Sequence, residues 1–443
     1  MKKFFSEDVL LHSESAKALY QGVKELPIID YHCHLDEKMI AADRKFSDIG
    51  SLWLEGDHYK FRAMRLMGVD EEFITGSASY REKFKKYAEV MPSLVGNPLY
   101  YFSHLELSQI FGITEPLSKD NADEVFDKAN EVLKDLGVSK ILEKFKVEYI
   151  ATTDDPCSAL SYHGQYGGTK VCPTFRPDRF LKPNHELVAE LEGVCNTKIA
   201  DLDAYVGALE ARLDYFVSKG CGISDHGMDF LPLADVSCEY ASDLFERYDS
   251  LNENEADQLS SYLLYRLAEM YAVRSIVMQI HYGTFRRVNT EMTKKLGADM
   301  GFDVMRSSCD IDRLATFFDT LNSQNALPKT VLYSLNPEFT TAAATISGAF
   351  PGVIIGAAWW FNDTLAGIKT NIEIVCEYAA LGSSLGMLTD SRSFASYVRF
   401  DFFRRILADF VGQKVEDGEY CMAHAEKLMY DVCYGNVKKL LKI

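Results

Sequence analysis

The sequence has few of the features that mark secreted, membrane or nucleic-acid-binding proteins. Its 443 residues carry a formal net charge of −18, whereas binding to nucleic acid or to an anionic membrane surface needs a basic surface. The ten cysteines include no CxxC pair and no regular spacing, which is typical of reduced thiols in the cytosol. We therefore expect a cytoplasmic protein with no nucleic-acid partner and no membrane partner.

Long hydrophobic runs are also missing. Ser6, Glu7 and Asp8 precede the first stretch that could serve as the apolar core of a signal peptide. One stretch, residues 339–362, carries no charge, but Pro351 and Gly352 divide it. We expect a helix, a turn and a buried strand there and not a membrane span.

Short apolar runs alternate along the chain with longer segments of helical periodicity. Continuous apolar strands indicate burial on both faces, as in a parallel sheet. Eight such alternations predict an α/β fold, a (β/α)8 TIM-type barrel that includes the whole chain, residues 1–443, as one domain. The expected strands are residues 27–35, 147–155, 170–178, 221–229, 275–283, 329–337, 352–361 and 385–392.

Two segments depart from this alternation. Residues 36–146 are far longer than one crossover helix requires and contain several helical patterns, so we expect a helical insertion over the barrel mouth. A C-terminal helical tail follows the last strand. Between the later strands, helices are expected at residues 200–220, 256–274 and 311–324.

Metal-ligating side chains stand at the ends of three expected strands, where barrels of this type have their active sites. His32 and His34 are two residues apart and share one face of a strand, so both can bind one ion. Asp390 ends the last strand, beside the first, and can complete a metal site, act as a base or simply cap the following helix. His281, at the end of the fifth strand, is either a third nitrogen ligand or a structural histidine.

Three arginines lie just past strand ends. A guanidinium is planar and always charged, which suits it to carboxylate or phosphate groups. Each one alone can be explained as a salt-bridging surface residue, but three at one rim of an acidic protein indicate an anionic ligand. These residues are Arg176, Arg286 and Arg392.

Several short segments together resemble the uronate isomerase family. The histidine pair, His281 and Asp390 are arranged as in the amidohydrolase superfamily, to which that family belongs. The more specific pattern is matched in order along nearly the whole chain. The matching segments are residues 57–60, 62–65, 68–69, 174–178, 278–281, 301–303, 359–363, 389–394 and 433–436.

The resemblance implies interconversion of D-glucuronate with D-fructuronate, and of D-galacturonate with D-tagaturonate, in hexuronate catabolism. It also implies a divalent metal, zinc, held by His32, His34 and Asp390 with His281 close by, and it leaves open whether turnover needs the metal. A hexuronate is then the small-molecule partner, and whether the chain forms a homo-oligomer is undecided.

The proton transfer from C2 to C1 of such a substrate needs a base and groups that stabilise the developing oxygen charges. Asp390 or Tyr59 is the expected base, with the other assisting. His58 and Arg392 are expected to polarise or protonate the oxygens. Because His58 and Tyr59 stand on the insertion, we expect the insertion to close the site and exclude water.

The remaining candidates would bind the substrate. Arg176, together with the metal, is expected to hold the carboxylate, and Arg286 and Asp225 to bind hydroxyl groups. Trp360 is the expected stacking wall, although core packing explains at least one of the two neighbouring tryptophans. Two alternatives stay open, a metal-dependent hydrolase and a sugar-acid-binding protein without catalysis.

Overall fold

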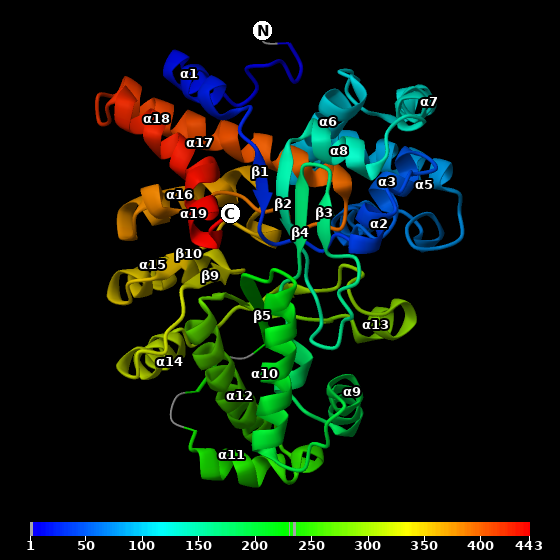
Figure 1. Ribbon diagram of the computed structural model, residues 1–443. Coiled ribbons are helices and arrows are strands. Elements are labelled where there is room, and N and C mark those ends of the chain that lie inside the picture. Colours follow the sequence, from blue (N-terminus) through cyan, green and yellow to red (C-terminus); the bar gives the residue numbers. More distant parts are fainter. Residues whose placement is uncertain (1–2, 230, 234–235) are drawn as a thin grey trace.

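The computed structural model describes residues 3–229, 231–233 and 236–443 and has the predicted (β/α)8 barrel (Figure 1). Parallel strands follow one another around it in two sheets, and Phe175 joins the sheets by pairing with Asp154 on one side and Ser224 on the other. The strands are β1 (Ile28–Asp30), β2 (Val147–Ala151) and β4 (Thr169–Cys172), then β5 (Ile223–Met228), β6 (Val277–Tyr282), β9 (Thr330–Ser334) and β10 (Val353–Ile355).

Burial of the strands explains their composition. All six residues of β6 are buried, and so are all three of β1. Strands covered on both faces are mostly apolar. Polar residues buried within them, such as Asp30 and Gln279, are hydrogen-bonded to other side chains. The same burial means that a polar side chain can reach solvent only beyond a strand's end, where the barrel opens.

The last expected strand, residues 385–392, differs from the prediction because it is not a regular strand. Asp390 N donates to His32 O (3.1 Å) and His34 N donates to Ser391 O (3.0 Å), so the segment does lie beside the end of β1. Thr389 N, however, donates to the side chain of Asp30 (2.9 Å). A side-chain acceptor here replaces a main-chain acceptor and interrupts the ladder.

Residues 36–146 form the predicted helical insertion. Figure 1 shows α3, α5 and α7 gathered on one side of β1. Capping boxes at Asp48 and Ser79 start two of these helices, and Gly112, with φ of 70°, ends another. The helices are α2 (Glu37–Ala41), α3 (Ile49–Leu54), α4 (His58–Leu66), α5 (Tyr80–Val90), α6 (Pro98–Phe111), α7 (Ala122–Leu133) and α8 (Val138–Lys144).

The other helices cover the barrel, and the tail follows α17. Those expected at 200–220, 256–274 and 311–324 are confirmed as α10, α12 and α14. The α-helices outside the insertion are α1 (Glu14–Val23), α9 (His185–Cys195), α10 (Leu202–Ser218), α11 (Cys238–Phe245), α12 (Glu253–Arg274), α13 (Thr290–Leu296), α14 (Asp312–Ser323), α15 (Thr340–Ala349), α16 (Leu365–Tyr378), α17 (Val398–Glu416), α18 (Met422–Tyr430) and α19 (Asn436–Leu441).

Two connections were not foreseen. Residues 152–168, all of them described, form a loop and the short strand β3 (Gly164–Tyr166), which pairs antiparallel with β4 in place of a crossover helix. After β6, the strands β7 (Thr284–Phe285) and β8 (Val304–Met305) form a small hairpin around α13. The uncharged stretch 339–362 contains α15 and β10 as expected, and no helix within the described residues is suited to span a membrane.

Candidate active site

Two histidines and a carboxylate converge where β1 meets the last barrel segment, and we call His32, His34 and Asp390 the histidine–carboxylate cluster. Nε2 of each histidine lies 3.2 Å from Oδ1 of Asp390. The three ligand atoms lie within 4.8 Å of one another. Two imidazole nitrogens and a carboxylate oxygen are a donor set that divalent ions such as Zn²⁺ accept, so the residues fit the predicted metal site.

The protonation states of two cluster members also suit a metal, because ligands must be deprotonated to bind. Burial lowers the pKa of His34 to about 4, against the opposing effect of Asp390. Burial alone would raise the pKa of Asp390, but hydrogen bonds from His32 and His34 hold it well below its usual value. Burial by itself would lower the pKa of His32, but Asp225 and Asp390 outweigh this effect and raise the pKa. A proton therefore competes with the metal at His32.

The backbone presents Asp390 in an unusual conformation. Its φ is 44°, in the left-handed region that Asp tolerates better than most residues. Thr389, just before it, is fixed by Asp30, whose carboxylate accepts from both Thr389 N (2.9 Å) and Thr389 Oγ1 (2.6 Å). The following helical turn is capped by Ser393. Asp390 therefore does not serve as a helix cap, and its side chain is directed to the histidines.

A second group, which we call the arginine cluster, consists of Arg176, Asp225 and His281. Oδ2 of Asp225 lies 3.2 Å from Nη1 of Arg176, and Oδ1 lies 3.1 Å from Nδ1 of His281. Burial would raise the pKa of Asp225, but His281 and Arg176 hold it well below its usual value. Burial lowers the pKa of His281, although Asp225 opposes this. Asp225 is 1% exposed and is enclosed by its partners.

Gly227 makes room for this arrangement. A Cβ at this position would lie 2.6 Å from Nε2 of His281 and 2.7 Å from Nη2 of Arg176. The Gly227 amide donates to Asp178 (2.9 Å), and the same carboxylate oxygen accepts from Nε of Arg176 (2.8 Å). Strand β5 thus carries Asp225 and, two residues later, the glycine that the arginine needs.

The insertion contributes the start of α4 to the site. Asp57 caps this helix by accepting from the amides of Tyr59 and Lys60, which fixes the two aromatic side chains that follow it. The hydroxyl of Tyr59 lies 3.3 Å from Oδ2 of Asp390. His58 stacks on Tyr59, with ring centroids 4.6 Å apart, and meets Trp360 edge-on at 6.0 Å. The helix cap therefore sets how Tyr59 approaches Asp390.

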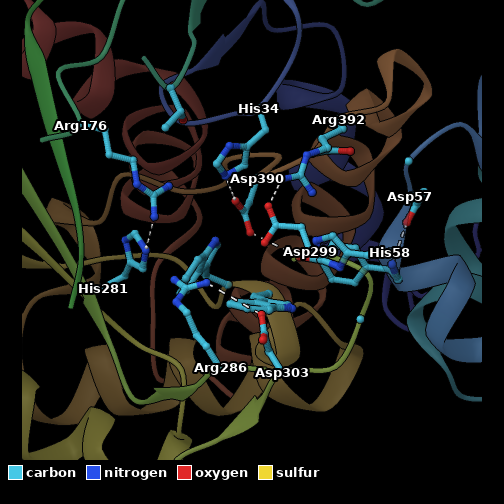
Figure 2. Close-up of a pocket in the computed structure, with 17 residues that line it drawn as sticks. His34, Asp57, His58, Arg176, His281, Arg286, Asp299, Asp303, Asp390 and Arg392 are labelled. Carbon is cyan, nitrogen blue, oxygen red and sulfur yellow. Dashed lines mark hydrogen bonds and ion pairs between the residues drawn. The ribbon is translucent and has the colours of Figure 1, made fainter. Parts of the chain in front are cut away.

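Every predicted site residue except His32 and Asp225 lines one cavity of about 250 Å³. Figure 2 shows Arg176 and His281 facing each other on one side, and His34 with Asp390 further in. Arg286 lies 5.8 Å from the ring of Trp360 and 3.4 Å from Asp229. The cavity has the size of a small polar metabolite and brings three arginines to its wall.

Comparison with known proteins decides the family. The model of the UxaC family, described as glucuronate isomerase, matches residues 1–441. The uronate isomerase of Clostridium perfringens is 40% identical over 465 residues, which cover 100% of both chains. That of Caldicellulosiruptor saccharolyticus is 41% identical over 460 residues, 99% of each chain. The chain belongs to the uronate isomerase family.

Solved structures agree with this assignment. The uronate isomerase of Thermotoga maritima superimposes with a TM-score of 0.96 at 34% identity and covers 99% of this chain and 100% of its own. The resemblance seen in the sequence motifs and the barrel fold are both confirmed. As a member of the uronate isomerase family, the protein is an enzyme that acts as an aldose–ketose isomerase.

Some cavity residues of this uronate isomerase family member were not singled out from the sequence. Asp299 forms an ion pair with Arg392 (2.9 Å), and its side chain is 54% exposed. Asp303, inside a family motif, lies 3.8 Å from Arg286. Thr153 also lines the cavity. Thr153 could have been found from its place after β2, whereas Asp299 lies in the β7–β8 connection, where no periodic pattern points to it.

Proposed function

We propose that the protein interconverts D-glucuronate with D-fructuronate, and D-galacturonate with D-tagaturonate, by moving a proton between C2 and C1. The observation that supports this proposal most directly is that the Tyr59 hydroxyl lies 3.3 Å from Oδ2 of Asp390 in the wall of the cavity. Two proton-transfer groups side by side serve a reaction at two adjacent carbons. The relatives' printed name, uronate isomerase, supports the same class of substrate.

Tyr59 and Asp390 have different roles in the proposal because they differ in protonation state. Burial raises the pKa of the Tyr59 hydroxyl well above its usual value, whereas Asp390 is held ionised. In the proposal Asp390 removes the C2 proton and Tyr59 assists as the protonated partner. Positioned acid–base groups of this kind contribute roughly 10²–10⁴-fold to a rate.

Asp390 can be both a ligand and a base because its oxygens face different neighbours. Oδ1 is the atom that both histidines contact, and Oδ2 is the atom that Tyr59 contacts. A carboxylate that uses one oxygen as a ligand keeps the other for proton transfer. A bound divalent ion, zinc in this proposal, would act as a Lewis acid toward a substrate oxygen.

The arginines explain why a sugar acid fits better than a neutral sugar. Arg176 would hold the substrate carboxylate, and Arg286 would bind hydroxyl groups next to the Trp360 wall. Arg392 and His58 would face the oxygens on which charge develops. Because Asp225 is enclosed behind Arg176 and His281, its role in the proposal is to hold these two residues and not to contact the sugar.

The test is a turnover assay in deuterated buffer with D-glucuronate and D-galacturonate, each with and without a chelator. We expect a ketose as the product, with deuterium from the solvent in it. D-Glucose, which has a hydroxymethyl group in place of the carboxylate, is the matched control and should react far more slowly. In a parallel assay with sugar-acid lactones and amides, cleavage of these compounds without ketose formation from either uronate would replace the isomerase by a hydrolase. Absence of any turnover would leave a binding protein.

A further inference from the structure

A buried arginine lies next to the proton-transfer pair, by which we mean Tyr59 and Asp390. Arg399, in the first turn of α17, is 3% exposed and does not belong to the residues that line the cavity. Its guanidinium carbon lies 5.3 Å from the ring centroid of Tyr59, within the range of a cation–π contact. The arginine therefore contacts Tyr59, one member of the pair, without lining the cavity itself.

The same guanidinium also holds the backbone just before Asp390, the other member of the pair. Nη1 donates to Thr389 O at 2.7 Å, the carbonyl of the peptide bond that leads into Asp390. Nη1 lies 3.2 Å from Oδ2 of Asp363, which is 4% exposed. Asp363 N donates in turn to the carbonyl of Trp360, the stacking wall. One side chain thus ties together three segments that are far apart in the sequence.

We propose that Arg399 is a positioning residue for the isomerisation, which sets the approach of Tyr59 to Asp390 without touching the substrate. This inference rests on the proposed function. A guanidinium is suited to the task because its planar fork holds fixed directions toward several partners at once. Tyr59 comes from the insertion and Asp390 from the barrel, and Arg399 contacts both elements. Arg176 and Arg286, the arginines proposed to hold the substrate, line the cavity, whereas Arg399 does not. Loss of Arg399 should therefore lower turnover and not affinity.

A matched control exists in the same helix. Arg404 is 4% exposed and donates to the carbonyls of Lys24 (3.2 Å), Leu26 (3.0 Å) and Pro27 (3.0 Å). It is as buried as Arg399 and likewise bonded to main-chain oxygens, but it borders a different cavity. Loss of either arginine should destabilise the fold, and only loss of Arg399 should disturb the pair.

The experiment compares Arg399→Met, Arg399→Lys, Arg404→Met and the double variant Arg399→Met/Asp363→Asn with the wild type. For each, kcat and KM for D-glucuronate and the thermal midpoint are measured. A displacement of about 1 Å in a reacting group costs on the order of 10²-fold, so Arg399→Met should lose about that factor in kcat with KM nearly unchanged. Arg399→Lys should recover part of the loss.

The remaining variants separate positioning from stability. Arg404→Met should lower the thermal midpoint and leave kcat intact. In the double variant a neutral amide replaces the buried carboxylate that Arg399→Met leaves without its cation, so the midpoint should recover while kcat stays low. Equal losses of kcat in Arg399→Met and Arg404→Met, or recovery of kcat in the double variant, would reduce Arg399 to a structural role. A wild type that makes no ketose would overturn the proposed function itself.

Discussion

Each of the two clusters at the barrel mouth places imidazole groups against a carboxylate, but the neighbours of that carboxylate differ. In the histidine–carboxylate cluster, two imidazoles share one oxygen of Asp390. In the arginine cluster, Asp225 has an imidazole on one oxygen and the guanidinium of Arg176 on the other. The clusters approach each other closely, with His32 Nδ1 4.0 Å from Asp225 Oδ1.

The difference lies in where the positive charge comes from. Asp225 is neutralised by a cation that belongs to the protein, so this cluster has no need of a metal and can offer the guanidinium to an anion. Asp390 has two histidines, which are neutral when they act as ligands, and its charge can be balanced by a bound divalent ion. We infer that the metal belongs to the first cluster and the substrate carboxylate to the second.

The sharpest way to break this comparison is to remove the histidines of each cluster in turn. We expect the wild type to bind about one equivalent of metal per chain and His32→Asn/His34→Asn to abolish this binding. His281→Asn should keep the metal, because Nδ1 of His281 contacts Asp225 (3.1 Å) and Nε2 contacts Nη2 of Arg176 (3.5 Å). Elemental analysis of the purified proteins measures both. Metal lost from His281→Asn as well would make His281 a ligand and end the division between the clusters.

A second large effect should follow from loss of Asp390, the carboxylate proposed to serve both as a metal ligand and as the base. Asp390→Asn keeps the shape and removes the charge, and we expect kcat to fall by roughly 10²–10⁴-fold. Asp401→Asn is the control, because Asp401 is a mostly buried carboxylate held by Tyr20 and Arg405, away from this cavity. Steady-state kinetics on both variants decide the point, and a nearly normal kcat in Asp390→Asn would exclude it as the base.

Most of the histidine–carboxylate cluster could be predicted from the sequence. The spacing of His32 and His34 gives a shared strand face, and the adjacency of the first and last strands in a closed barrel brings in Asp390. These are consequences of regular geometry. The irregular end of the last barrel segment could not be foreseen, because it depends on the Asp30 side chain taking the place of a main-chain acceptor.

The arginine cluster was harder to predict because contacts between neighbouring strands determine which of its side chains pair with one another. The sequence marks Arg176, Asp225 and His281 as polar residues at strand ends, but it does not say that Asp225 is enclosed by the other two. The pairing of Asp299 with Arg392 depends on a long connection without periodic pattern. That residues 1–443 form one domain stays a prediction.

A moderate effect is expected from the arginine that faces the substrate. Charged hydrogen bonds contribute about 1.5–3 kcal/mol, so Arg176→Ala should lower kcat/KM for D-glucuronate by roughly 10–100-fold. Arg176→Lys should restore only part, because lysine keeps the charge and loses the fork. Arg179, which pairs with Asp155 and Glu190 outside the cavity, is the control. If Arg176→Ala lowered the thermal midpoint and left kcat/KM intact, Arg176 would be only a bridge between strand ends.

The smallest effect tests the fit of the arginine cluster without removing any of its members. Gly227→Ala adds a single methyl group, and the atoms it meets, Nε2 of His281 and Nη2 of Arg176, are the ends of side chains that can shift. The fold should therefore tolerate the change, while the guanidinium moves away from the position in which it meets the substrate. If the displacement weakens the contact between the guanidinium and the substrate by about 1 kcal/mol, kcat/KM falls about fivefold. Gly222→Ala, just before the same strand, is the matched control, since a Cβ there meets nothing within 4 Å. Equal kinetics in the two variants would show that the position of Arg176 is not critical and that the substrate carboxylate binds elsewhere in the cavity.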